Sequence, residues 1–186
     1  TLFLHCLALP RAISQTSPFW TTYQHDARHT GLSPFAGPQT NTVKWTLDLI
    51  GLPDPVAGPT GLIYLSFETS RWNWKVVAVN PDGTIAFQTA TYFGRGGPAP
   101  TIADDGTIYA GTGTSSGSST DLYAFYPDGT LKWKRALPAF APATLGPDGT
   151  VYVAAGSFLT GGLNQLVALN PSDGSSKWIY DFYSGI

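Results

Sequence analysis

Hydrophobic and polar positions alternate along most of the chain in short runs, and each run ends at a glycine, a proline or an Asp-Gly step. This two-residue alternation predicts half-buried β-strands, because a helix would repeat its apolar positions every three or four residues. The expected strands come in sets of four, at 100–103, 107–110, 122–125 and 132–133, and then at 143–145, 150–153, 166–169 and 177–178. No segment has a helical period, so the pattern predicts an all-β protein.

The alternation is itself repeated. Tyr64, Tyr109 and Tyr152 occupy the same place in successive repeats and lie 45 and 43 residues apart. A period in the forties built from four short strands is typical of a β-propeller blade, and such blades must stack and close into a ring. We therefore predict a partial β-propeller of about three four-stranded blades plus a stub at Lys44-Trp45, the last strand of a blade whose earlier strands are missing. The ring is incomplete, and either sequence outside this chain or further copies would complete it.

Five aspartates precede a glycine where a tight turn is expected, at Asp82, Asp105, Asp128, Asp148 and Asp173. Aspartate bonds backbone amides two residues on, and glycine accepts the positive φ of such turns, so these five are predicted to be turn formers. The acids left for chemistry are Asp26, Asp48, Asp54, Glu68, Asp104, Asp121 and Asp181.

The amino-terminal residues predict export. Residues 1–14 combine an apolar run with Ala12 and Ser14, the small residues of a signal peptidase site, and are interpreted as a signal-peptide remnant. An apolar strand that closes the last blade is the alternative. Residues 15–44 are predicted to form an entry segment and residues 45–186 the blades. If residues 1–14 are a signal-peptide remnant, the protein is expected in the periplasm, at the cell surface or outside the cell.

Composition and charge narrow the chemistry further. The net charge is −2 with scattered basic residues, which disfavours a nucleic-acid partner, and no transmembrane segment is predicted. Cys6 is the single cysteine, so disulfides, thiolate-bound zinc and a cysteine nucleophile are not expected in the blades. His25 and His29 would share a metal only on a helix, and their segment has no helical period. We expect no metal site.

One end of the propeller is predicted to bind partners. The connections between second and third strands vary between repeats, whereas the Asp-Gly turns at the other end do not, and binding residues favour such loops on a rigid scaffold. The predicted protein- or glycan-binding residues are Arg71, Trp72, Trp74, Tyr92, Phe93 and Arg95. In the alternative interpretation, Trp72 and Trp74 cover the open end of the first blade. Phe87, Trp133 and Trp178 recur at equivalent positions and are expected to pack between blades.

The repeated motifs resemble a known family. They are the Asp-Gly-Thr-(Ile/Val)-Tyr string at 105–109 and 148–152, the Leu-Tyr-Ala-Phe-x-Pro-Asp-Gly-Thr string at 122–130, and Lys-Trp at 132–133 and 177–178. They resemble the pyrroloquinoline-quinone-like β-propeller repeats of quinoprotein alcohol dehydrogenases and of the propeller lipoprotein of bacterial outer-membrane barrel assembly. The resemblance covers residues 57–178, and residues 20–31 are similar to the entry segment of secreted members.

In the dehydrogenase branch, the resemblance implies a quinone between a tryptophan and a disulfide of adjacent cysteines, with calcium held by acidic and amide side chains. This sequence has no adjacent cysteines, so we expect no catalytic residue and no cofactor within residues 1–186. The preferred interpretation is a non-catalytic exported scaffold, similar to the outer-membrane assembly branch. The alternatives are a fragment of a quinoprotein dehydrogenase whose active site lies outside this chain, and a surface adhesive or carbohydrate-associated propeller.

Overall fold

The computed structural model describes residues 40–49, 54–70, 73–93, 95–113, 121–137, 139, 141–156 and 164–182. These ranges contain fourteen strands and no helix, which confirms the all-β prediction. Every pairing between the strands is antiparallel. The strands form three sheets, each built on four strands in chain order, as the repeat predicts.

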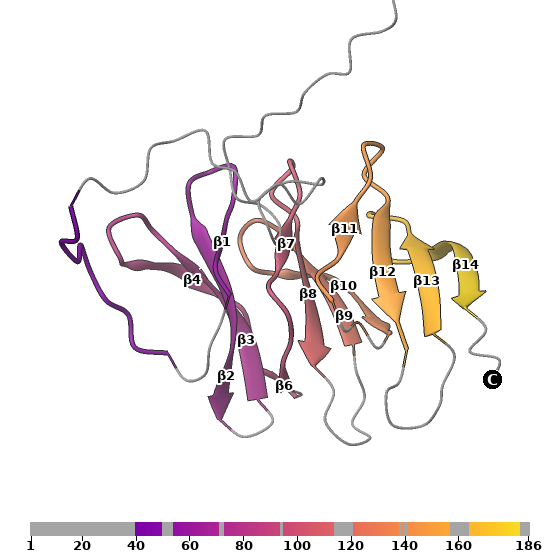
Figure 1. Ribbon diagram of the computed structural model, residues 1–186, viewed down its shortest axis with the longest axis horizontal. Helices are drawn as coiled ribbons and strands as arrows, with labels where there is room; N and C mark the ends of the chain where they lie inside the picture. Colours follow the sequence, from indigo (N-terminus) through magenta and orange to yellow (C-terminus); the bar gives the residue numbers. More distant parts are fainter. Residues whose placement is uncertain are drawn as a thin grey trace, which may run out of the picture.

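The first blade comprises β1 (Val56–Ala57), β2 (Ile63–Ser70), β3 (Asn73–Val79), β4 (Ile85–Gln88) and the short β5 (Tyr92–Phe93). The second comprises β6 (Arg95–Gly96), β7 (Thr101–Ile102), β8 (Ile108–Gly113), β9 (Asp121–Phe125) and β10 (Leu131–Ala136). The third comprises β11 (Thr144–Leu145), β12 (Val151–Ala155), β13 (Asn164–Leu169) and β14 (Ser176–Phe182). Figure 1 shows the blades side by side in chain order, from violet to yellow.

The Asp-Gly turns form as predicted. In the first blade, the Thr84 amide donates to Asp82 Oδ1 at 2.9 Å, and the amide of Gly83, at a φ of 92°, donates to the Asn80 carbonyl at 2.9 Å. Each of the other four aspartates likewise accepts a hydrogen bond from the amide two residues on. The hydroxyl of Thr84 also donates to Asp82 and holds the pKa of this carboxyl below its ordinary value. These five acids are therefore structural.

Two apolar clusters join the blades. Between the first and second blades, Tyr64, Val76 and Ala78 meet Ile108 and Phe125. Between the second and third, Tyr109, Leu122, Ala124 and Trp133 meet Val151, Val153, Val167 and Leu169. Each cluster combines aromatic and aliphatic side chains from two neighbouring blades. The core of this protein is thus the space between blades, as stacking requires.

The stub before the first blade differs from the prediction. Residues 41–49 form no strand. Trp45 nevertheless packs, with Leu47 and Leu49, against the outer side of the first blade at Phe67 and Val77. Its indole Nε1 donates to the Pro81 carbonyl at 3.0 Å, so this segment covers the sheet by side-chain packing without adding a strand to it.

An aromatic side chain from each unit lies against the Asp-Gly turn of the next. A β-carbon added at Gly83 would come within 2.7 Å of the Trp45 ring. At Gly129 and Gly174 the same atom would lie 2.6 Å from Phe87 and 2.8 Å from Trp133. These turns therefore need glycine twice over, for the positive φ and for the approach of the ring.

Candidate binding site at the seam between the first two blades

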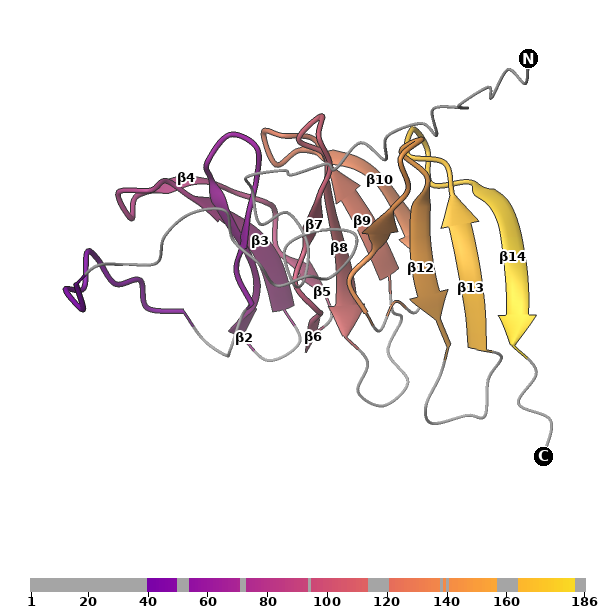
Figure 2. The ribbon, with the colours of Figure 1, turned by 45° about the horizontal axis from the view of Figure 1, so that its top comes forward.

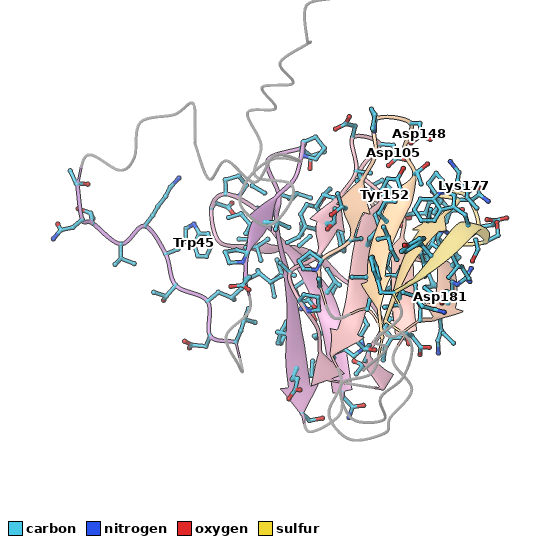
Figure 3. The ribbon with its side chains drawn as sticks, turned by 45° about the vertical axis from the view of Figure 1, so that its right-hand side comes forward. Trp45, Asp105, Asp148, Tyr152, Lys177 and Asp181 are labelled. Atoms are coloured by element: carbon cyan, nitrogen blue, oxygen red, sulfur yellow. The ribbon has the colours of Figure 1, made fainter. Side chains whose placement is uncertain are left out.

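The connections between second and third strands lie at one end of the molecule and the Asp-Gly turns at the other, as the repeat predicts. In Figures 1 and 2, β2, β8 and β12 end, and β3, β9 and β13 begin, at one common end, which lies at the bottom of both views. We call it the loop end. Asp105 and Asp148, from two of the Asp-Gly turns, lie at the opposite end (Figure 3).

At the loop end, the chain crosses from one blade to the next between β5 and β6. In β5, Tyr92 pairs with Trp74 and Phe93 with Asn73, so this strand belongs to the first blade. In β6, Arg95 pairs with Gly113, so the second blade begins there. This crossing, together with the residues packed beneath it, is called the seam below. It brings together the backbones of four predicted site residues, Trp74, Tyr92, Phe93 and Arg95, whereas Arg71 and Trp72 lie outside the described residues.

Trp74 and Tyr92 meet an aromatic cluster of the second blade. The ring centroids of Trp74 and Tyr92 are 5.8 Å apart. The Tyr92 centroid also lies 4.7 Å from that of Tyr123 and 5.7 Å from that of Phe125. Trp74 and Tyr123 meet edge to face at 5.2 Å. Trp74 has no exposed surface, so it packs in the core, and it lies within β3, not in the loop that the sequence suggested. Tyr92 remains partly exposed, and burial raises the pKa of its phenol.

The seam also carries an ion pair. Lys134 Nζ lies 2.8 Å from Asp121 Oδ2, the carboxyl is nearly buried, and the Tyr123 hydroxyl donates to the same oxygen at 3.3 Å. The Asp121 amide donates to Thr112 Oγ1 at 2.8 Å. The bond with Asp121 raises the pKa of Lys134, while burial, and then the Asp121 charge, raises that of Tyr123. The ammonium also lies 5.4 Å from the Tyr123 ring centroid, a cation–π contact.

Sequence reasoning kept Asp121 among the candidate acids but did not pair it with Lys134. The other blades bear related polar links between their third and outer strands. Lys75 bonds Gln88 in the first blade, and Gln165 Nε2 donates to Asp181 Oδ1 at 2.6 Å in the third. The missed signal was thus a polar residue within the first three positions of each third strand, at Lys75, Asp121 and Gln165. The links in the first and third blades are exposed hydrogen bonds that each involve an uncharged glutamine. Of these three links, only the one at the seam is an ion pair with a buried carboxyl.

The quinone and calcium site implied by the resemblance does not fit the residues present. The only cysteine is Cys6, so no pair of adjacent cysteines exists to flank a quinone. Within the described part of the chain, no three histidine, cysteine, aspartate or glutamate side chains gather closely enough to hold a metal ion. None of the described residues forms a helix long and apolar enough to cross a membrane.

Three antiparallel sheets of four repeated strands that pack on one another through shared apolar clusters define the class of protein: the chain is part of a β-propeller. No family model matches the chain, and no curated protein does. Among solved structures, it is similar to the quinohemoprotein alcohol dehydrogenase from Comamonas testosteroni, with a TM-score of 0.62 and 18% identity over 92% of this chain. At that identity the likeness shows the fold alone.

The chain spans 28% of that dehydrogenase chain. A protein of unknown function from Bacteroides caccae also matches, with a TM-score of 0.43 and 16% identity over 66% of this chain and 43% of the other. The predicted fold, a partial propeller of the kind found in quinoprotein dehydrogenases, is confirmed by the first of these comparisons.

Proposed function

We propose that this chain is part of an exported β-propeller that acts as a non-catalytic scaffold and binds a protein or glycan at its loop end, over the seam. The observation that carries the proposal is the crossing between β5 and β6, which gathers the backbones of four predicted binding residues where two rigid blades meet. Aromatic and arginine side chains at the centre of a rigid surface contribute most to binding energy in interfaces.

Within this site the residues have different roles. Among the predicted site residues whose side chains the structure describes, Tyr92 is the one with exposed surface, and its ring packs on Trp74, Tyr123 and Phe125. Trp74 is a positioning residue because its side chain is fully buried beneath Tyr92. The Asp121–Lys134 pair supports the same platform from the second blade, and it leaves the half-exposed ammonium at the edge of the seam. Such a surface suits the apolar face and hydroxyls of a sugar, or a polar peptide.

The test is binding of the chain to a glycan array and to a panel of purified cell-envelope proteins, with variants compared at equal folded concentration. We expect Tyr92→Ala and Arg95→Ala to weaken any interaction at least tenfold. Tyr126→Ala is the matched control, because Tyr126 is also an exposed tyrosine but belongs to an Asp-Gly turn at the opposite end. A ligand whose affinity is unchanged by the first two variants, or is reduced equally by the control, would refute a loop-end site.

The second candidate function is a piece of a quinoprotein dehydrogenase whose active site lies outside residues 1–186. The similarity to the quinohemoprotein enzyme favours it, since that chain has the same fold over 92% of this one. The two proposals differ in the rest of the reading frame. Adjacent cysteines and a cluster of acidic and amide residues there, with dye reduction after addition of quinone and calcium, would support the enzyme. A reading frame that lacks both would support the scaffold.

A further inference from the structure

A row of three side chains crosses the first blade at the loop end. Glu68, near the end of β2, pairs with Trp74 of β3, and Trp74 pairs in turn with Tyr92 of β5. Residues directly opposite one another in a sheet lie on the same face. Because the rings of Trp74 and Tyr92 both contact Tyr123, this row faces the second blade. Glu68, which is partly exposed, therefore places a carboxyl beside the aromatic cluster of the seam.

Two buried polar atoms lie on the same face as this row. Within the described residues, Ser66 Oγ and Trp74 Nε1 are buried side-chain atoms without a hydrogen-bond partner. Ser66 precedes Glu68 by two positions on β2 and pairs with Val76, so it is a diagonal neighbour of Trp74. Ser66 is 5% exposed and Trp74 is fully buried, so bulk solvent does not serve either group.

Buried polar groups elsewhere in the described chain are paired. Each of the six other buried polar residues has a side-chain hydrogen bond or an ion pair: Thr89, Thr101, Thr107, Thr112, Asp121 and Thr150. An unpaired buried polar group costs stability, so two such groups on one face of adjacent strands call for a common explanation.

We propose that the loop-end site takes a neutral saccharide. One sugar oxygen accepts hydrogen bonds from Trp74 Nε1 and Ser66 Oγ, and a neighbouring sugar hydroxyl donates to Glu68. An indole N–H only donates and a carboxylate only accepts, so the ligand must offer an acceptor and a donor side by side, as adjacent sugar hydroxyls do. The apolar face of the sugar packs on the Tyr92 ring. This proposal rests on the loop-end function proposed above and names its ligand.

The surface around the row favours a saccharide over a protein. Protein interfaces have an apolar core in which aromatic side chains are enriched. In the described parts of the first two blades, the most exposed large apolar side chains adjoin Asp-Gly turns at the opposite end: Ile85, Tyr126 and Leu131. The described part of the loop end offers the Tyr92 ring and hydrogen-bonding groups instead. The charge of Glu68 also repels a carboxylate or sulfate, so the saccharide is neutral.

The sugar reaches the buried groups when the Tyr92 side chain moves. Its strand, β5, has two residues, which are held to β3 by the pairs of Phe93 with Asn73 and of Tyr92 with Trp74. Rotation of the partly exposed Tyr92 ring opens a path to the Trp74 indole, and side-chain rotations of this kind are common when ligands bind.

The experiment follows the indole N–H resonances of the isotope-labelled chain while neutral oligosaccharides that bind on a glycan array are added. The Trp74 resonance, assigned by its loss in Trp74→Phe, should shift as its hydrogen bond forms. Trp133 already donates to the Pro171 carbonyl at 3.0 Å, so its resonance should stay in place. Trp178, expected from the sequence to pack between blades, is instead 45% exposed, and its resonance controls for non-specific contact.

Two variants separate binding from folding. Ser66→Ala removes an unpaired hydroxyl, so the midpoint of urea unfolding should stay unchanged or rise, while saccharide affinity falls about fivefold. Thr101→Val is the matched control, because it removes a buried hydroxyl that donates to the Ala143 carbonyl at 2.7 Å. It should lower the midpoint and leave the affinity unchanged. Glu68→Gln should weaken binding of the neutral saccharide and reduce the discrimination against its uronic-acid analogue.

Equal shifts of the three indole resonances, or unchanged saccharide affinity in both Ser66→Ala and Glu68→Gln, would overturn the proposal. So would a midpoint lowered as much by Ser66→Ala as by Thr101→Val, because the Ser66 hydroxyl would then already have a partner in the fold. A purified cell-envelope protein that binds through Tyr92, where no saccharide does, would overturn the saccharide and leave the loop-end function standing. Binding of neither kind of ligand would count against both proposals.

Discussion

Replacing Gly174 by alanine tests whether the aromatic contact between blades stabilises the stack. Gly174 has a φ of 72°, and an added β-carbon would lie 2.8 Å from Trp133 Cε3. The left-handed conformation costs an alanine about 1–2 kcal/mol. Forcing the buried indole aside adds about 1–3 kcal/mol of overpacking. If the Trp133 Nε1 bond to the Pro171 carbonyl is lost as well, the total reaches about 3–6 kcal/mol, since such a bond contributes about 1 kcal/mol.

Gly149→Ala is the matched control. Gly149 has a similar φ of 77°, but an added β-carbon would meet only Pro171 Cγ at 3.8 Å, an ordinary contact. This variant should therefore lose only the conformational term of about 1–2 kcal/mol. The difference between the two variants isolates the cost of crowding Trp133, and the free energies come from urea unfolding followed by circular dichroism.

A Trp133→Ala background supplies the second check. With the indole removed, the cost of Gly174→Ala should fall to that of Gly149→Ala, because only the backbone term remains. Equal destabilisation by the two glycine variants in the natural background, to within about 0.5 kcal/mol, would refute the claim that contact between Trp133 and the Gly174 turn stabilises the stack. So would an undiminished cost of Gly174→Ala when Trp133 is absent.

Three further predictions concern charged and phenolic groups. Lys134→Met should destabilise the protein by about 1–3 kcal/mol in urea unfolding, because it leaves the Asp121 carboxylate buried without its cation. The double variant with Asp121→Asn should recover part of that loss. The Thr150 hydroxyl, with its amide, lowers the pKa of Asp148 to about 2. That lowered value stabilises the fold above the ordinary aspartate pKa, and the gain is lost as pH falls through about 2; Thr150→Val should return the Asp148 titration, followed by NMR, toward the ordinary value. Burial, and then the Asp105 charge, raises the pKa of Tyr109 to about 12. Stability should therefore fall as pH rises from the ordinary tyrosine value toward 12, and Tyr109→Phe should remove a phenol that ionises near pH 12 in an absorbance titration.

The sequence pattern was sufficient for the fold class because the signals are local and occur three times. Alternation fixes which residues face a neighbouring sheet, and Asp-Gly fixes where the chain turns. The turn at Asp82-Gly83 and the burial of Tyr109 both follow from these rules. Repetition supports the assignment of strands and turns independently, since a wrong assignment in one repeat would conflict with the other two.

Contacts between blades were beyond the reach of the pattern. Trp74 carried the sequence signature of a loop aromatic, and only the register of β3 with β5 shows that it packs under Tyr92. Asp121 and Lys134 are thirteen residues apart, and the turn between them hides their pairing from any local rule. Trp178 has the same sequence context as Trp133, yet its exposure depends on whether another blade lies beyond it.

The sequence by itself therefore determined the repeat, the strands, the turns and the order of the blades, since each depends on residues that are close along the chain. The tertiary structure alone decided which aromatic residues are covered, how the seam is assembled and where an apolar face stays open. Those properties depend on contacts between residues some forty positions apart, such as Trp133 and Pro171, and the free energy of such contacts is set by what lies opposite in space.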